Sequence, residues 1–163
     1  MRNLRHEPRR VRQADPRRKG VVLVEMAIVI SVFAVFMAGV IEFGHAYLVI
    51  GSLNAATRGA ARLGTVDDVT TSDVVAEANR ILGSAFDNTR AVVRVKNAGV
   101  FDTPGIDPTT IDYAALPDVE VDDLEAGDLF VVRIDVEYED VSLMPPFWAK
   151  NLTLRSQSVM RHE

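Results

Sequence analysis

An apolar stretch near the N-terminus constrains this 163-residue chain more than any other feature. It covers residues 21–41, and no charged side chain occurs in residues 26–41. A helix of about 20 residues spans the hydrocarbon layer of a bilayer, because each residue advances it by about 1.5 Å. We therefore expect one transmembrane helix over residues 21–41 in a single-pass protein, with room for one modest domain beside it.

The residues before this stretch are strongly basic. Residues 1–20 contain eight basic and two acidic residues, a net charge of +6, so the other residues carry −11 in a chain whose total is −5. Basic residues flanking an apolar helix stay on the cytoplasmic side. We expect a cytoplasmic leader over residues 1–20 and a domain outside the membrane. Nucleic-acid binding would be an alternative role for the leader, but the acidic remainder would repel nucleic acid, so we expect no such partner.

The transmembrane helix is expected to continue beyond the membrane over residues 42–64. No proline occurs between Pro16 and Pro104, so the helix can run from about Val21 to Arg62, with Gly64 as a stop. Small residues at four-residue spacing would let helix backbones approach closely. They form two adjoining rows, Gly51, Ala55 and Gly59 in one, and Ala56, Ala60 and Gly64 in the other. The alternative is that these glycines weaken or break the helix.

Residues 65–163 are expected to form the external domain. Residues 70–72 offer N-cap side chains ahead of an amphipathic helix with apolar residues at helical spacing up to Phe86. Alternating patterns predict strands over residues 90–96, 128–140 and 152–160, with a surface loop over residues 102–128. The second strand shows one phase shift near Val132 and Arg133. The predicted inward residues of the last two strands are Leu129, Val131, Ile134, Val136, Tyr138, Leu152, Leu154 and Val159.

The predicted fold class is α+β. A long N-terminal transmembrane helix would continue into a small external domain with a short helix and an antiparallel sheet of three or four strands packed on helical surface. Phe147 and Trp148 follow two prolines and are expected to cap this sheet. The alternative is an exposed aromatic patch that contacts another subunit.

No residue pattern indicates catalysis, a metal site or a cofactor. The absence of cysteine excludes disulfides, thiol catalysis and cysteine-bound zinc. Glu42 and His45 could pair on one side of the helix, but two residues are too few for a metal site. His6 and His162, in the terminal segments, suggest no role. The acidic run beginning at Asp118 raises a calcium hypothesis, but its sixth position is Asp123 rather than the glycine of an EF-hand.

The order of residues around Gly20 differs from that of a secretory signal peptide. A secretory signal peptide has its small-residue cleavage site after the apolar core, whereas Gly20 precedes the core. Cleavage between Gly20 and Val21 would leave the apolar helix on the mature chain, with a new amine at Val21 and a carboxylate at Glu25. A carboxylate inside an apolar segment is costly and is a functional candidate by default.

This arrangement resembles the class III signal of type IV prepilins and pseudopilins, which a membrane aspartyl peptidase cuts after a glycine. Further motifs resemble the TadE-like family of tight-adherence (Flp) pilus assembly proteins; they are Glu25-Met26, Glu42-Phe43-Gly44, the Ala/Arg-rich residues 54–62 and the ending at residues 158–163.

The resemblance implies a pilin-like fold and a non-enzymatic minor pseudopilin or assembly factor in a bacterial inner membrane. Its expected partners are lipid, prepilin peptidase and other pilus or secretion-system subunits. Glu25 would pair with the Val21 amine of a neighbouring subunit.

Two alternatives remain open for the membrane segment. Glu25 could extend to the headgroups and water rather than pair with an amine. The chain could also be an uncut signal-anchor protein whose external domain binds an envelope partner or ligand. A third class, an anchored hydrolase, has no supporting residue constellation.

Overall fold

The computed structural model describes the backbone of residues 16–163 and the side chains of residues 20–163. Residues 1–15, most of the predicted leader, lie outside the described residues, and His6 with them. The chain divides into two compact units, Met1–Gly39 and Val40–Glu163. The helices are α1 (Pro16–Leu63), α2 (Thr71–Gly83) and α3 (Tyr138–Val141), and the strands are β1 (Val92–Asn97), β2 (Leu129–Glu137) and β3 (Thr153–Arg161). The predicted α+β class is confirmed.

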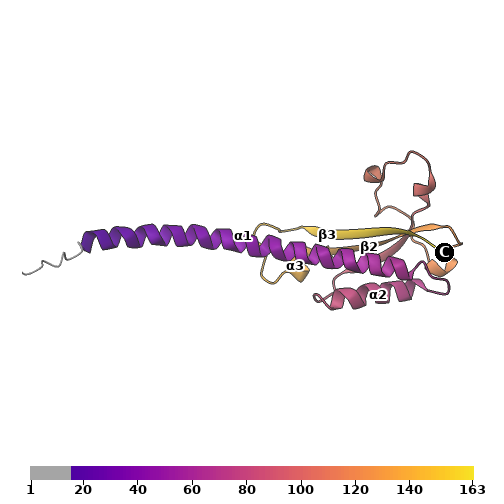
Figure 1. Ribbon diagram of the computed structural model, residues 1–163, viewed down its shortest axis with the longest axis horizontal. Helices are drawn as coiled ribbons and strands as arrows, with labels where there is room; N and C mark the ends of the chain where they lie inside the picture. The colour runs from indigo at the N-terminus through magenta and orange to yellow at the C-terminus, as the bar shows by residue number, and fades with distance from the viewer. Residues whose placement is uncertain (1–15) are drawn as a thin grey trace, which may run out of the picture. The chain divides into compact units, whose positions relative to one another are not determined.

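Helix α1 is continuous over 48 residues (Figure 1). It begins at Pro16, a residue favoured at the first helical position because its missing N–H is not needed there. Five glycines occur inside the helix without ending it, so the alternative of a glycine break is wrong. The helix ends at Leu63, and the Gly64 N–H donates to the Ala60 carbonyl at 3.1 Å. The predicted stop at Gly64 is confirmed.

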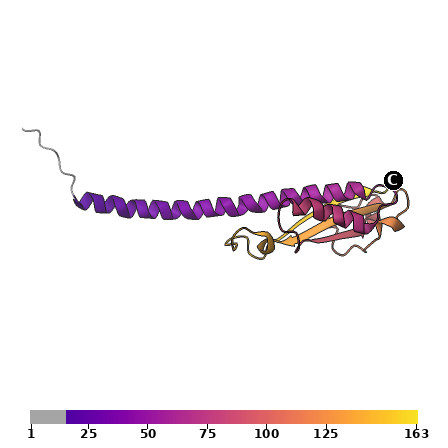
Figure 2. The same cartoon turned by 90° about the horizontal axis from the view of Figure 1, so that it is seen from below.

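The part of α1 in the second unit covers one face of the sheet together with α2 (Figures 1 and 2). Its buried face alternates steps of three and four residues, the spacing of one side of a helix; it consists of Ala46, Val49, Leu53, Ala56 and Ala60. Three of these five residues are alanine, so the helix backbone lies close to its neighbours. This face belongs to the single apolar core of the domain.

Helix α2 begins with a capping box. The Thr70 hydroxyl accepts from the Asp73 N–H, and the Asp73 carboxylate accepts from the Thr70 N–H at 3.0 Å. Two helix-end donors are thereby satisfied. Val74, Ala78 and Leu82 are buried at four-residue spacing. The predicted N-cap region and the amphipathic character of this helix are confirmed.

The sheet has three antiparallel strands in the order β1-β2-β3. In the central strand the register is regular from Leu129 to Glu137, and every even-numbered residue from Phe130 to Val136 belongs to the core that the helices share. The predicted phase shift near Val132 and Arg133 is therefore wrong, and Val131 belongs to the other face. The pattern misleads because that second face is also covered: Val131 is fully buried, and only 6% of Arg133 is exposed.

Strand β3 buries one of the three apolar residues predicted to point inward in this region, and it also buries a serine. Leu154 is buried as expected, but Leu152 is 42% exposed and Val159 is 37% exposed, so these two predictions are wrong. The buried position next to Leu154 on this face is Ser156. Its hydroxyl donates to Asn54 Oδ1 at 2.6 Å and lies 3.0 Å from Thr57 Oγ1. Because α1 supplies these polar partners, a hydroxyl can be buried at the helix–sheet boundary.

Candidate functional site

The predicted processing site lies on α1. Gly20 is exposed and has open space where a side chain would begin, and Val21 is 68% exposed. Glu25 is also exposed and follows Val21 by four residues, which places the two on the same side of the helix. The structure thus leaves the Gly20–Val21 bond and the Glu25 carboxylate accessible on one short helical segment.

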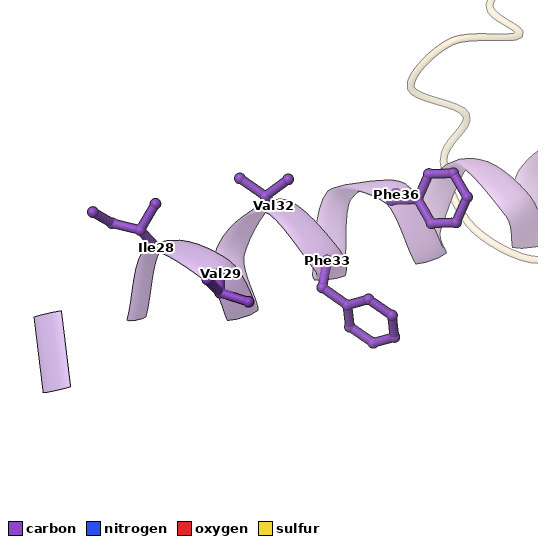
Figure 3. A pocket seen from close by; sticks show the side chains of 5 residues that line it. All are labelled: Ile28, Val29, Val32, Phe33 and Phe36. Carbon is purple, nitrogen blue, oxygen red and sulfur yellow. The ribbon is translucent and has the colours of Figure 1, made fainter. Parts of the chain in front are cut away.

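The segment that follows Glu25 is uniformly apolar and uncovered. Large apolar residues from Val21 to Phe36 are each between 56 and 71% exposed. An 18-residue window of this helix has a mean hydropathy of 2.7, and none of it is buried, so the helix is long and apolar enough to cross a membrane. A shallow hollow on its surface is lined by Ile28, Val29, Val32, Phe33 and Phe36 (Figure 3). These side chains point outward from one helix and offer no polar group to a ligand.

The two rows of small residues on α1 have different surroundings. Ala56, Ala60 and Gly64 are buried inside the domain. A methyl group added at Gly64 would lie 3.0 Å from the Phe130 ring. In the other row, Gly51 and Ala55 are exposed, whereas a methyl group at Gly59 would meet the Ile81 side chain at 2.5 Å. Only the first two members of the predicted packing row are therefore accessible to another helix.

Glu42 is held by backbone donors from a distant loop. Its carboxylate accepts from the N–H groups of Phe147 at 3.1 Å, Trp148 at 3.0 Å and Ala149 at 2.6 Å. Desolvation raises the pKa of Glu42, but these three hydrogen bonds and the nearby charge of Lys150 outweigh it, so the net pKa is lowered from the ordinary 4.5. Glu42 therefore anchors this loop to α1.

Tyr138 connects the same turn of α1 to the end of β2. Its hydroxyl donates to the Glu42 backbone carbonyl at 2.9 Å and lies 3.3 Å from His45 Nδ1. Burial raises the pKa of Tyr138, and the negative charge of Glu42 raises it further. Glu42 and His45 are therefore connected through Tyr138, rather than through the direct side-chain pair that their spacing would allow.

The loop that binds Glu42 carries exposed apolar side chains. Phe147 is 72% exposed and Trp148 is 42% exposed, with their rings 4.8 Å apart in an edge-to-face arrangement. Leu143 and Met144 in the same loop are 75% and 56% exposed. The prediction that Phe147 and Trp148 cap the sheet is therefore wrong. The loop's backbone is bound to Glu42, which turns these side chains away from the core.

Two acidic residues of the calcium hypothesis and His162 make contacts within the domain. Asp118 lies 2.9 Å from the buried Lys96 ammonium, and Asp128 accepts the Glu125 N–H. Among residues 16–163, no group of three or more acidic or histidine side chains is arranged to hold a metal ion. His162, to which the sequence gave no role, is buried, and its Nδ1 lies 3.0 Å from the Gly64 carbonyl. It joins the end of β3 to the end of α1.

These features define a class of protein: a small α+β domain attached to one uncovered apolar helix of membrane-spanning length, with the properties of a membrane-anchored protein. Residues 20–62 match the family model described as TadE-like protein. The N-terminal segment is thus similar to TadE-like proteins, as its motifs predicted, and that family is associated with Tad pili. No curated protein and no solved structure matches the chain.

Proposed function

We propose that this chain is a minor pseudopilin or assembly factor of a Tad-type (Flp) pilus or a related secretion system. The family match over residues 20–62 carries the proposal, because it contains every residue to which an assembly role was assigned. These residues are Gly20, Val21, Glu25, Gly51, Ala55 and Gly59. The leader would remain in the cytoplasm and the domain would lie on the periplasmic side of the inner membrane.

Processing by a prepilin peptidase would convert the exposed Gly20–Val21 bond into a mature N-terminus. Hydrolysis removes the basic leader and frees the Val21 amine at the cytoplasmic end of the apolar helix. Glu25 lies one helical turn further along the apolar segment; insertion scales give a cost of about 2.5–3.5 kcal/mol for a charge at the centre of a bilayer and less for one near its surface. A neighbouring subunit's Val21 ammonium would offset this cost and set the axial stagger of the two helices.

Lateral contact between subunits would use the accessible part of the small-residue row. Gly51 and Ala55 are exposed on α1 and lie four residues apart, the spacing at which two helix backbones can approach closely. Gly59 contributes less, because Ile81 of the same chain covers it. Gly51→Leu should therefore reduce cross-linking between subunits, whereas Val66→Leu, at an exposed residue outside the row, should not.

N-terminal sequencing of the mature protein tests the processing step. In the native host, a chain that begins at Val21 supports the proposal, and Gly20→Leu should leave the leader attached. A matched control is Gly44→Leu, which alters another exposed helix glycine and should leave cleavage unchanged. A chain that still begins at Met1 with the peptidase present contradicts the proposal. That result favours the alternative of an uncut signal-anchor protein whose domain binds an envelope partner or ligand.

A further inference from the structure

The loop over residues 143–148 is bound to the residue at which the apolar segment ends. Glu42 is the first charged residue after the charge-free residues 26–41, and Val40 and Ile41 belong to the same compact unit as the loop. Three consecutive N–H groups at the end of this loop donate to the Glu42 carboxylate, none over a distance greater than 3.1 Å. The position of the loop is thus determined relative to the last residues of the apolar segment.

Four large apolar side chains of the loop are exposed on the surface of the described part of the chain. They are Leu143, Met144, Phe147 and Trp148, which are between 42 and 75% exposed. The loop lies at the opposite end of the sheet from the C-terminus (Figures 1 and 2). An apolar group of this size on a protein surface indicates contact with another apolar phase.

We propose that residues 143–148 insert into the interface of the bilayer that α1 crosses, on the side where the domain lies. The partner is lipid because the loop is bound at the level where the apolar helix emerges, and Val40 and Ile41 at this level are themselves about half exposed. Tryptophan prefers this region, where its ring contacts acyl chains and its N–H can remain hydrated. The neighbouring Lys150 is exposed and can approach anionic headgroups.

This second contact would restrict the domain's rotation on its membrane helix. The hydrogen bonds to Glu42 give the loop a fixed position relative to α1, so burying the loop in lipid limits the orientations that the domain can take. The proposal rests on α1 crossing a bilayer but does not require a role in a pilus.

Trp148 is the only tryptophan of the chain and provides a direct probe. The full chain would be placed in bilayers of phosphatidylcholine and phosphatidylglycerol whose acyl chains are brominated either near the headgroup or near the methyl end. We expect Trp148 to lose more emission with the shallow bromine than with the deep one. Acrylamide in the water should quench it less than in the urea-unfolded chain. Phe147→Ser should reduce the bromine quenching, whereas Val66→Ser, at an exposed residue near the far end of α1, should not.

Other results would overturn the proposal. Full quenching by acrylamide without bromine quenching would place the loop in water. Protection from acrylamide without bromine quenching, varying with protein density, would indicate a protein partner instead. A control chain with Trp148→Phe and Phe33→Trp reports on the helix itself. If deep bromine quenches the tryptophan of this control but neither bromine quenches Trp148 of the parent, α1 crosses the bilayer and the loop proposal is wrong. If bromine quenches neither chain, the membrane anchor is wrong as well.

Discussion

The Ala149 N–H donates to the Glu42 carboxylate across 2.6 Å, although 107 residues separate them in the chain. Glu42 belongs to the long helix and Ala149 precedes the last strand, so this contact closes the domain at one end. At the other end, the buried His162 ring lies 3.0 Å from the Gly64 carbonyl. The final strand is therefore joined to α1 near both of its ends.

Removing the Glu42 carboxylate should loosen the loop over residues 143–149. Glu42→Ala leaves the N–H groups of Phe147, Trp148 and Ala149 without their acceptor, so we expect a lower melting midpoint and greater exposure of Trp148 to acrylamide. Thermal unfolding in detergent, followed by near-ultraviolet circular dichroism, measures the first effect. Asp140→Ala removes an exposed carboxylate near the same loop and should change neither quantity. Equal melting of the Glu42→Ala chain and the parent would contradict the anchoring role.

The stabilisation by Glu42 should depend on pH in a defined direction. Because the folded state lowers the pKa of Glu42, its contribution is present above the ordinary value of 4.5 and is lost as the pH falls through the lower folded pKa. The melting difference between the parent and Glu42→Gln should therefore shrink as the pH falls below 4.5. Comparing the two chains at each pH cancels the contributions of other acids, among them Asp73. A difference that stays constant with pH would show that the charge of Glu42 does not contribute.

Sequence patterns predicted the elements of this fold better than its contacts. The absence of proline predicted the long helix, and the cap residues before Val74 predicted α2, because both depend on neighbouring residues. The face of α1 that packs on the sheet was also present in the sequence as the three- and four-residue spacing from Ala46 to Ala60. Gly51, Ala55 and Gly59 also have helical spacing, so spacing alone did not identify the buried face.

The errors concern groups whose partners lie far away in the sequence. Ser156 is buried because Asn54 and Thr57 satisfy its hydroxyl across about 100 residues. Trp148 is exposed because the backbone beside it binds Glu42. Neither relationship produces a local pattern, so the hydrophobicity of Trp148 alone led to the prediction that it caps the sheet. The predicted Gly20–Glu25 pattern depends, by contrast, only on residues that lie close together in the sequence.

Substitution by alanine should change the stability of the chain in opposite directions at Gly51, inside α1, and at Gly64, directly after its end. Gly51→Ala adds a methyl group in open space on a helix and should stabilise the chain by about 1 kcal/mol, because alanine favours helix more than glycine does. Gly64→Ala places a methyl group 3.0 Å from the fully buried Phe130 ring and 3.2 Å from Val74, and should destabilise it by about 1–3 kcal/mol. Urea unfolding in detergent measures both. Stabilisation by Gly64→Ala would contradict the close packing at the end of α1.

The buried hydroxyls between α1 and β3 should contribute to stability as a connected pair. The Ser156 hydroxyl donates to Asn54 Oδ1, and the Thr57 hydroxyl, 3.0 Å from it, also lies 3.1 Å from the Leu53 carbonyl that can accept its proton. Ser156→Ala leaves Asn54 Oδ1 without this donor and removes the contact with Thr57, and should destabilise the domain by about 1–2 kcal/mol. The matched control Ser158→Ala, at a half-buried residue on the same face, should change stability by less than about 0.5 kcal/mol.

A double-mutant cycle tests whether the two hydroxyls act together. Thr57→Val keeps the side-chain volume and removes the hydroxyl, so it should be destabilising in the parent but less so in the Ser156→Ala background, where its partner is already absent. We expect a coupling energy of about 0.5–1.5 kcal/mol from urea unfolding of the four chains. Strict additivity of the two substitutions would mean that the 3.0 Å contact contributes nothing to joining β3 to the helix.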